Sequence, residues 1–280
     1  MFILFDIGGT KMRIAKSDGE IILGTAIKLN TPASFDEAIE LLVKTATDLA
    51  GEDKIEGVVG GLTGVVEPSD GRLTFAPHTP DWLGKPFVKA VSTALDAPVY
   101  VENDSVMVGL GEATYGAGRG AKILMYMTVS TGVGGARIVD GHIDSGAFGF
   151  EPGHQLIGSD KDAETLESLV SGSALERQFN KKPQDIPQTD PVWQKIAETL
   201  AIGIYNSALH WSPDVIVVGG SMIVGSPAIP FDTVIETLTK KNKVMNPLPN
   251  IKRAELGDEG GLYGALAYLN KVVLGQDVLE

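Results

Sequence analysis

One pattern, two strands joined by a glycine-containing turn, occurs twice in the sequence and constrains the fold more than any other feature. The first copy contains Gly8-Gly9, Arg13-Ile14, Asp18-Gly19 and Ile21, and the second contains Gly134-Gly135, Arg137-Ile138, Asp140-Gly141 and Ile143. Apolar runs lead into the copies, from Phe2 to Phe5 and from Lys122 to Val129. Short strand-turn-strand units are common, so a chance match is the alternative, but the similar spacing favours duplication of an α/β half.

The remainder of the chain fits two α/β domains. Its 280 residues are enough for two domains that each bury a core. Ser34 and Glu37 have the spacing of a capping box before an amphipathic helix. Further elements are expected at residues 55–59 (strand), 86–95 (helix), 99–101 (strand), 192–210 (helix) and 215–218 (strand). We place the boundary near Tyr115, which gives domains of residues 1–115 and 116–280.

Charge and composition exclude several classes of partner. The formal net charge of −13 repels phosphate backbones and anionic lipid, so we expect neither nucleic acid nor a membrane as a partner. No apolar run approaches the roughly 20 residues needed to cross a bilayer, and the start lacks the features of a signal peptide, so a cytoplasmic location is expected. The chain has no cysteine and therefore neither disulfides nor thiolate metal sites.

The glycine turns suit the binding of phosphate. Backbone N–H groups in tight turns that lack side chains form concave sites for phosphate oxygens, and Gly8-Gly9-Thr10-Lys11 adds a hydroxyl and an ammonium group. Ser130-Thr131-Gly132 supplies hydroxyls to a second turn. For each turn alone, an equally good explanation is that a tight turn needs glycine for steric reasons and binds nothing. Neither fits the Walker or Rossmann pattern, so two turns together indicate a polyphosphate site of another type.

Several motifs resemble, in order, those of the ROK family of bacterial sugar kinases and related repressors. They are Asp6-Ile7-Gly8-Gly9-Thr10-Lys11, Val101-Glu102-Asn103-Asp104, Ser130 to Gly135, Glu151-Pro152-Gly153-His154, Gly219-Gly220-Ser221 and Gly257 to Ala267. The resemblance implies a duplicated actin-like ATPase fold, which is ribonuclease H-like, with two lobes and a central cleft. It also implies that a last helix, at about residues 260–275, packs back on the first lobe, and that the protein is a homodimer.

The resemblance assigns the acceptor side of a kinase reaction. Asp104 matches the catalytic base, a role that typically contributes 10²–10⁴-fold to rate; its alternative is an N-cap of the following helix. Asn103 is expected to bind sugar hydroxyls, and Gly64 to approach the sugar through its backbone. His78 stands where the family often has asparagine, and it is expected to influence the choice of sugar.

Three further residues match positions that contact sugar. Glu151 and His154 lie three residues apart in a turn with glycine and proline, which keeps them out of a regular helix and lets both face one ligand. Glu167 matches a third family position, and its alternative is a solvated helix charge. Glu164 is interpreted as such a solvated charge.

For the nucleotide, the resemblance assigns phosphate contacts to Gly8, Gly9, Thr10, Lys11, Thr131 and Gly132. Gly219 and Gly220 are placed beside adenosine, and Asp6 near Mg²⁺ through water. The family's usual zinc site uses one histidine and three cysteines between His154 and Glu167, where this chain has Gly158-Ser159-Asp160-Lys161-Asp162-Ala163. Because the soft ligands are missing, we expect a protein without zinc.

The resulting expectation is ATP-dependent phosphorylation of a hexose, with glucose O6 as the leading acceptor and fructose or N-acetylhexosamines as alternatives. A repressor would need a DNA-binding segment before the first strand, whereas Asp6 already belongs to the phosphate motif. A sugar sensor without catalysis is disfavoured by the presence of Asp104. A glycosidase would leave both glycine turns unexplained.

Overall fold

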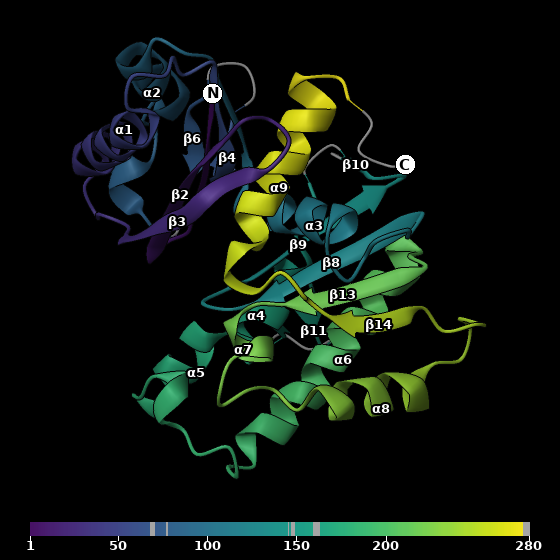
Figure 1. Ribbon diagram of the computed structural model, residues 1–280. Helices are drawn as coiled ribbons and strands as arrows, with labels where there is room; N and C mark the ends of the chain where they lie inside the picture. Colours follow the sequence, from purple (N-terminus) through teal and green to yellow (C-terminus); the bar gives the residue numbers. More distant parts are fainter. Residues whose placement is uncertain (68–70, 77, 145, 147–148, 159–162, 277–280) are drawn as a thin grey trace. The chain divides into compact units, whose positions relative to one another are not determined.

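The computed structural model describes residues 1–67, 71–76, 78–144, 146, 149–158 and 163–276 (Figure 1). Contacts within the chain define two compact units. Unit 1 contains Met1–Thr114 and Asp258–Glu280, and unit 2 contains Tyr115–Gly257. Each unit has its own five-stranded sheet and its own hydrophobic core. Among the described residues, no helix is long and apolar enough to cross a bilayer.

The sheet of unit 1 has the strand order β3-β2-β1-β4-β7. Its strands are β1 (Phe2–Ile7), β2 (Lys11–Ser17), β3 (Ile22–Asn30), β4 (Gly57–Leu62) and β7 (Val99–Asn103). β1 is antiparallel to β2 and parallel to β4, and β4 is parallel to β7. All residues of β1 and β4 are buried, because both faces of these central strands are covered. A small hairpin of β5 (Val65–Val66) and β6 (Leu73–Phe75) follows β4.

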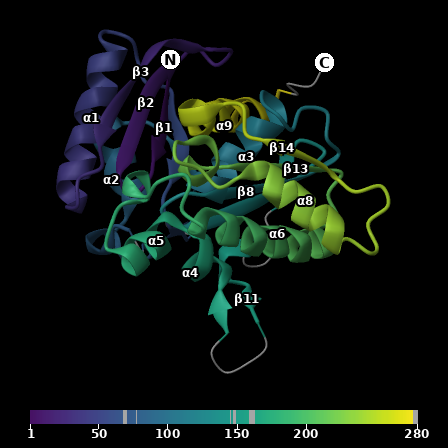
Figure 2. The ribbon, with the colours of Figure 1, turned by 90° about the horizontal axis from the view of Figure 1, so that it is seen from below.

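Helices cover both faces of this sheet. They are α1 (Phe35–Ala50), the 3-10 turn η1 (Pro80–Trp82), α2 (Phe87–Leu95), α3 (Asp104–Thr114), α9 (Gly260–Tyr268) and the π-helical turn η5 (Leu269–Val273). The hydroxyl of Ser34 accepts a hydrogen bond from the Glu37 amide at 3.4 Å, which confirms the predicted start of α1. Ile3, Phe5 and Ile7 point toward the core with α1 and α2. α3 and α9 pack against each other on unit 1, as the yellow α9 in Figures 1 and 2 shows.

The sheet of unit 2 has the order β10-β9-β8-β13-β14. Its strands are β8 (Ile123–Val129), β9 (Val133–Val139), β10 (His142–Ile143), β13 (Val215–Gly219) and β14 (Asn250–Arg253). β8 is antiparallel to β9 and parallel to β13, and β13 is parallel to β14. Order and direction therefore repeat those of unit 1 strand by strand, which confirms the duplication.

The prediction that Gly134 and Gly135 are equivalent to Gly8 and Gly9 is wrong. Gly134 and Gly135 were aligned with Gly8 and Gly9, yet they lie inside β9, and the turn that corresponds to Gly8–Thr10 is Ser130–Gly132. A packing contact explains the second glycine: a Cβ on Gly135 would lie 2.7 Å from Cγ of Pro152. Gly135 is thus required by the close approach of a neighbouring segment and not by a turn.

The connections of unit 2 are longer than those of unit 1. They contain η2 (Pro152–His154), β11 (Leu156–Ile157), β12 (Glu164–Thr165), α4 (Leu166–Val170), α5 (Gly172–Phe179), η3 (Pro183–Asp185), α6 (Val192–Trp211), α7 (Ser221–Val224) and α8 (Phe231–Lys241). The 3-10 turn η4 (Gly257–Glu259) begins at the last residue of unit 2 and continues into the second segment of unit 1. α6 and α8 run side by side (Figures 1 and 2). The core between them and the sheet includes Trp193, which is 1% exposed, as expected for a packing residue.

Candidate active site

In unit 1, most of the predicted catalytic and binding residues lie where the three parallel strands end. Asp6 is near the end of β1, Gly64 follows β4, and Asn103 and Asp104 end β7 and begin α3. The carboxyl ends of parallel strands meet at one edge of a sheet, so these groups converge although they are far apart in sequence. We refer to Asp6, the Gly8–Lys11 turn, Gly64, His78, Asn103 and Asp104 as the unit 1 site.

The turn from Gly8 to Lys11, the first glycine turn, is closed by local hydrogen bonds. The Gly8 amide donates to the Lys11 carbonyl at 2.9 Å, and the Thr31 hydroxyl donates to the Gly8 carbonyl at 2.7 Å. The Lys11 ammonium donates to Asn30 Oδ1 at 2.6 Å. Among the described residues, no acceptor pairs with the amides of Gly9 and Thr10. Two N–H donors are therefore open to an anion.

His78 lies against the first glycine turn. A Cβ on Gly9 would come within 2.5 Å of the His78 Cβ, so Gly9 has a steric requirement independent of any ligand. The imidazole also lies near Asp104, where it lowers the pKa of the carboxyl group and partly offsets the effect of burial. His78 is thus placed between the turn and the predicted base.

Asn103, and not Asp104, caps α3. Its Oδ1 accepts hydrogen bonds from the amides of Ser105 at 2.9 Å and Val106 at 3.3 Å. Its Nδ2 donates to the Gly64 carbonyl at 3.0 Å, which fixes Asn103 against the segment after β4. The alternative interpretation of Asp104 as the N-cap is therefore wrong. The sequence analysis missed the capping role of Asn103, although asparagine before a helix is a signal for it.

Asp104 is the first residue of α3 and is half-buried. Desolvation by burial raises the pKa of its carboxyl group, and the Ser105 amide, which donates to Oδ1 at 2.8 Å, lowers it in part. A raised pKa makes the ionised carboxylate a stronger base. The group has the chemistry of a proton acceptor for a hydroxyl.

Asp6 is the second buried carboxyl group of the unit 1 site. Burial and the nearby charge of Asp104 raise its pKa to about 7, against the opposing effect of Arg13, whose Nη1 lies 3.2 Å from Asp6 Oδ2. The side chain points toward the face that α9 covers, because neighbouring residues of β1 alternate between the two faces of the sheet. Arg13 also contacts Asp258 at 3.5 Å.

The carboxyl groups of Asp6 and Asp104 are suited to lie near a bound cation whose other ligands do not come from the protein. Two mutually repelling carboxylates are stabilised in their ionised forms by a nearby divalent cation. In the part of the chain that the structure describes, no cluster of three or more histidine or acidic side chains is arranged to hold a metal ion. The arrangement thus suits Mg²⁺ that keeps water and phosphate ligands, and it does not form a protein cage.

In unit 2, the turn from Ser130 to Val133, the second glycine turn, has one local hydrogen bond, from the Ser130 amide to the Gly132 carbonyl at 2.8 Å, and is otherwise held by segments distant in sequence. The Ser130 carbonyl accepts from the Gly172 amide at 2.7 Å, and the Thr131 carbonyl accepts from the Ser173 amide at 3.2 Å. The hydroxyls of Ser130 and Ser221 are 2.9 Å apart. Within the described ranges, the amides of Thr131 and Gly132 have no hydrogen-bond acceptor, so this turn too has two open donors.

The segments that carry the three predicted sugar contacts of unit 2 lie next to β9. Glu167 Oε2 accepts a hydrogen bond from the Val133 amide at 2.8 Å. η2 carries His154 and begins next to Glu151, and it packs on β9 through the contact of Pro152 with Gly135. Both Glu151 and His154 are exposed. The interpretation of Glu167 as a solvated helix charge is therefore wrong. Glu164 is exposed as expected, but it lies on the strand β12 and not on a helix.

Gly219 is the last residue of β13, and Gly220 follows it as the residue before α7 (Ser221–Val224). Gly220 has φ of 90°, and a Cβ there would collide with the carbonyl oxygen of Val129. These features let β13 end close to β8, so the fold itself requires a glycine at position 220. Ser221 follows and contacts Ser130, which places this glycine pair next to the second glycine turn.

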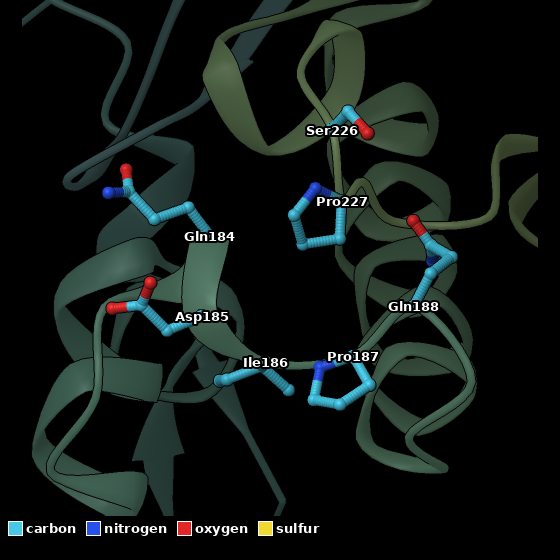
Figure 3. Close-up of a pocket in the computed structure, with 7 residues that line it drawn as sticks. All are labelled: Gln184, Asp185, Ile186, Pro187, Gln188, Ser226 and Pro227. Carbon is cyan, nitrogen blue, oxygen red and sulfur yellow. The ribbon is translucent and has the colours of Figure 1, made fainter.

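A cavity of about 340 Å³ lies in unit 2 beside this region (Figure 3). Its lining residues come from two loops and are Gln184, Asp185, Ile186, Pro187, Gln188, Ser226 and Pro227. The Gln188 side chain joins the loops, since it donates to the Ala228 carbonyl at 2.8 Å and accepts from its amide at 2.7 Å. Sequence reasoning missed this cavity, because a loop without periodicity gives no signal. Residues 159–162, which replace the family's zinc ligands, lie outside the described residues.

Comparison with known proteins settles the family. The family model described as "ROK family" matches residues 3–272. This chain belongs to the ROK family. Relatives of this ROK chain include a glucokinase from Streptomyces coelicolor, 24% identical over 93% of the chain and 94% of the relative, and an N-acetyl-D-glucosamine kinase from Citrobacter koseri, 27% identical over 95% and 98%. A fructokinase from Pediococcus pentosaceus is 26% identical over 93% and 94%.

Solved structures agree with this assignment to the ROK family. A ROK hexokinase from Thermus thermophilus is 26% identical and superimposes with a TM-score of 0.78 over 95% of this chain and 97% of its own. A ROK glucokinase from Streptomyces griseus, solved with glucose and AMPPNP, is 25% identical with a TM-score of 0.77 over the same shares. The expected actin-like ATPase fold is thereby confirmed.

Proposed function

We propose that this ROK protein is an ATP-dependent hexose kinase that transfers the γ-phosphoryl group of ATP to O6 of glucose. The observation that supports the proposal best is the position of Asp104: a carboxyl group with a raised pKa directly follows β7 and begins α3, in the same unit as a glycine turn with two open amides. Phosphoryl transfer requires mainly positioning and charge stabilisation, to which a base and a phosphate site contribute directly.

In the proposed reaction, the oxygen of the sugar hydroxyl attacks the γ-phosphorus while Asp104 accepts the proton of that hydroxyl. The new O–P bond forms as the bond between the γ-phosphorus and the β–γ bridging oxygen breaks, and ADP leaves with that oxygen. The second N–H of Asn103 Nδ2 is assigned to a sugar hydroxyl, since its first pairs with Gly64. His78 of unit 1 and Glu151, His154 and Glu167 of unit 2 are assigned to the remaining sugar contacts.

We assign the phosphates of ATP to the open amides of the two glycine turns, together with Lys11 and the hydroxyls of Thr10 and Thr131. The nucleoside is assigned to the end of β13 at Gly219 and Gly220. The cavity at Gln184–Gln188 supports this assignment, because a Cβ on Gly172 would lie 3.0 Å from the Ser130 carbonyl and 3.5 Å from Pro183. The second glycine turn and the cavity are thus neighbours within unit 2.

Mg²⁺ is proposed as the cofactor, and Asp6 as the residue that orders its water ligands. When bound, the ion neutralises charge on the transferring phosphoryl group. We also propose that the protein holds no zinc, because the chain has no cysteine to supply the family's usual ligand set. A cytoplasmic location is proposed as well, and a homodimer is proposed by analogy with the ROK family. Fructose and N-acetylhexosamines are the alternative acceptors, because relatives with those printed activities match as extensively as the glucokinase.

The proposal is tested by release of ADP from ATP and Mg²⁺ with glucose, mannose, fructose, N-acetylglucosamine, N-acetylmannosamine or no sugar. We expect sugar-dependent release, highest with glucose. Asp104→Asn should still bind ATP and sugar but lose at least about 100-fold in turnover. The matched control is Glu102→Gln, which removes another carboxyl group whose pKa burial raises, two residues away. Near-normal turnover by Asp104→Asn would contradict the assignment of the base.

A further inference from the structure

The Glu167 side chain is built into the second glycine turn. Its Oε2 accepts the Val133 amide at 2.8 Å, and Val133, the residue directly after the open amides of Thr131 and Gly132, is only 4% exposed. An amide in such a buried position needs an acceptor, and the carboxylate supplies one. The contact joins residues 34 positions apart, so local sequence does not produce it.

The same short segment holds the other end of the turn. Ser171 ends α4 and also caps α5, where its side chain accepts from the Ala174 amide at 3.1 Å. The next two amides, of Gly172 and Ser173, donate to the carbonyls of Ser130 and Thr131. Residues 167–173 therefore bind the turn at both ends. At its start they donate to two carbonyls of the turn, and at its end they accept a hydrogen bond from the Val133 amide.

We propose that Glu167 is a positioning residue for phosphate binding, in addition to its assigned sugar contact. Its carboxylate fixes the Val133 amide, and this hydrogen bond keeps the Thr131 and Gly132 amides in the direction that receives phosphate oxygens. Oε1 is left for a sugar hydroxyl, so one side chain serves both ligands. The inference rests on the proposed function, because it takes the turn to bind the phosphates of ATP.

The first test is sugar-free binding of ATP to the full-length chain, measured by calorimetry. Glu167→Ala should weaken ATP binding by about 10-fold, the usual cost of one lost hydrogen bond to a charged group. Glu167→Gln should stay within about 3-fold of the wild type, because its amide oxygen still accepts the Val133 amide. The control is Glu164→Ala, which removes an exposed carboxylate three residues away and should bind ATP like the wild type.

A sugar-contact residue without a positioning role gives a different result. In that case Glu167→Ala binds ATP as the wild type does when sugar is absent, and the inference is overturned. Circular dichroism shows whether Glu167→Ala is folded; if it is not, weaker ATP binding by Glu167→Gln with its fold intact also overturns the inference, since the acceptor is retained.

A second measurement needs no ligand and separates this inference from the proposed function. Hydrogen exchange of the Val133 amide should be at least about 10-fold faster in Glu167→Ala than in Glu164→Ala or Glu167→Gln. If the wild type binds no ATP, the proposed function fails, whereas the exchange result still supports or overturns the role of Glu167 in the turn. Equal exchange in all variants shows that the carboxylate does not hold the turn.

Discussion

The two glycine turns have the same place in duplicated sheets but are stabilised differently. The first is closed by residues within about 25 positions, namely its own Lys11 with Asn30 and Thr31. The second also has one local hydrogen bond, from the Ser130 amide to the Gly132 carbonyl, but its other contacts are with Glu167, Gly172, Ser173 and Ser221, which are roughly 35 to 90 positions away. Duplication thus preserved the strands and the pair of open amides, while the supporting contacts diverged.

In these two halves, equivalent turns are held by hydrogen bonds from different parts of the chain. A turn with local support is recognisable from a short motif, and it tolerates change elsewhere in the chain. A turn that is held by residues distant in sequence depends on the positions of those residues. A ligand that binds one of these residues can therefore change the conformation of the turn. The predictions below test this contrast from the largest expected effect to the smallest.

The largest effect is expected from adding one methyl group to the first glycine turn. Gly9→Ala would place a Cβ 2.5 Å from the His78 Cβ, and overpacking of this kind should lower the free energy of unfolding by about 2–3 kcal/mol and weaken ATP binding. Gly8→Ala is the matched control, because its Cβ would meet only the Lys11 carbonyl at 3.6 Å. Urea unfolding measures both variants.

The same clash predicts a specific rescue. Adding His78→Ala to Gly9→Ala should not restore stability, since alanine keeps the Cβ that collides. Adding His78→Gly should restore part of it. Equal stabilities of the two double variants would show that the backbone around Gly9 relaxes and that the turn is less rigid than its contacts indicate.

An intermediate effect concerns buried charge. The first turn is preceded by Asp6, whereas the equivalent position in unit 2 is Thr128, so only one half carries a carboxyl group there. Because the folded pKa of Asp6 is raised from 3.8 to about 7, the folded state binds the proton more tightly than the unfolded chain does. Its contribution to stability is therefore present at low pH and is lost as pH rises from about 4 to about 7.

Asp6→Asn should abolish this pH-dependent loss. Between pH 5 and pH 7, the free energy of unfolding of the wild type should fall by about 2 kcal/mol relative to that of the variant, whatever the constant cost of leaving Arg13 without this partner. Urea unfolding at several pH values gives the two curves, with Asp53→Asn, an exposed change, as control. Parallel curves for the wild type and Asp6→Asn would refute the raised pKa.

The smallest effect compares single hydroxyls on the two turns. Thr31→Ala removes the donor to the Gly8 carbonyl, and Ser221→Ala removes the partner of the Ser130 hydroxyl. We expect a loss of about 1 kcal/mol for Thr31→Ala and about half of that for Ser221→Ala, since the hydrogen bond of the Thr31 hydroxyl is partly buried whereas the contact between Ser130 and Ser221 is exposed. Thermal unfolding of the two variants ranks them, and the reverse order would show that the second turn is the more weakly supported.

Much of the fold was predictable because its signals are local. Strand patterns, the Ser34 cap and the repeated hairpins all depend on residues close in sequence, and the structure confirms them. The register between the copies was not predictable from spacing, because Gly135 is a glycine for its contact with Pro152. A sequence pattern cannot distinguish a glycine needed in a turn from one needed under a neighbouring segment.

The candidate site shows the same division. Asp6 and Asn103 lie near or at the ends of strands and Asp104 directly follows one, and these positions made them candidates from sequence and motif together. The bond from Val133 to Glu167 and the cavity at Gln184–Gln188 arise from tertiary packing between loops. Such contacts depend on where the ends of helices and the loops between them lie in the folded unit. Hydrophobic periodicity predicts the helices but not these positions.

The division of unit 1 into two segments has a consequence for synthesis on the ribosome. All residues of unit 2 emerge before Asp258, so unit 2 can fold while translation continues, whereas unit 1 waits for α9. Until then, the surface of α3 that α9 covers in unit 1 is exposed to solvent and to chaperones. Asp6 lacks part of its cover at that stage, because Gly261 of α9 lies against its side chain. The unit that carries the proposed base is thus the last to be completed in the nascent chain.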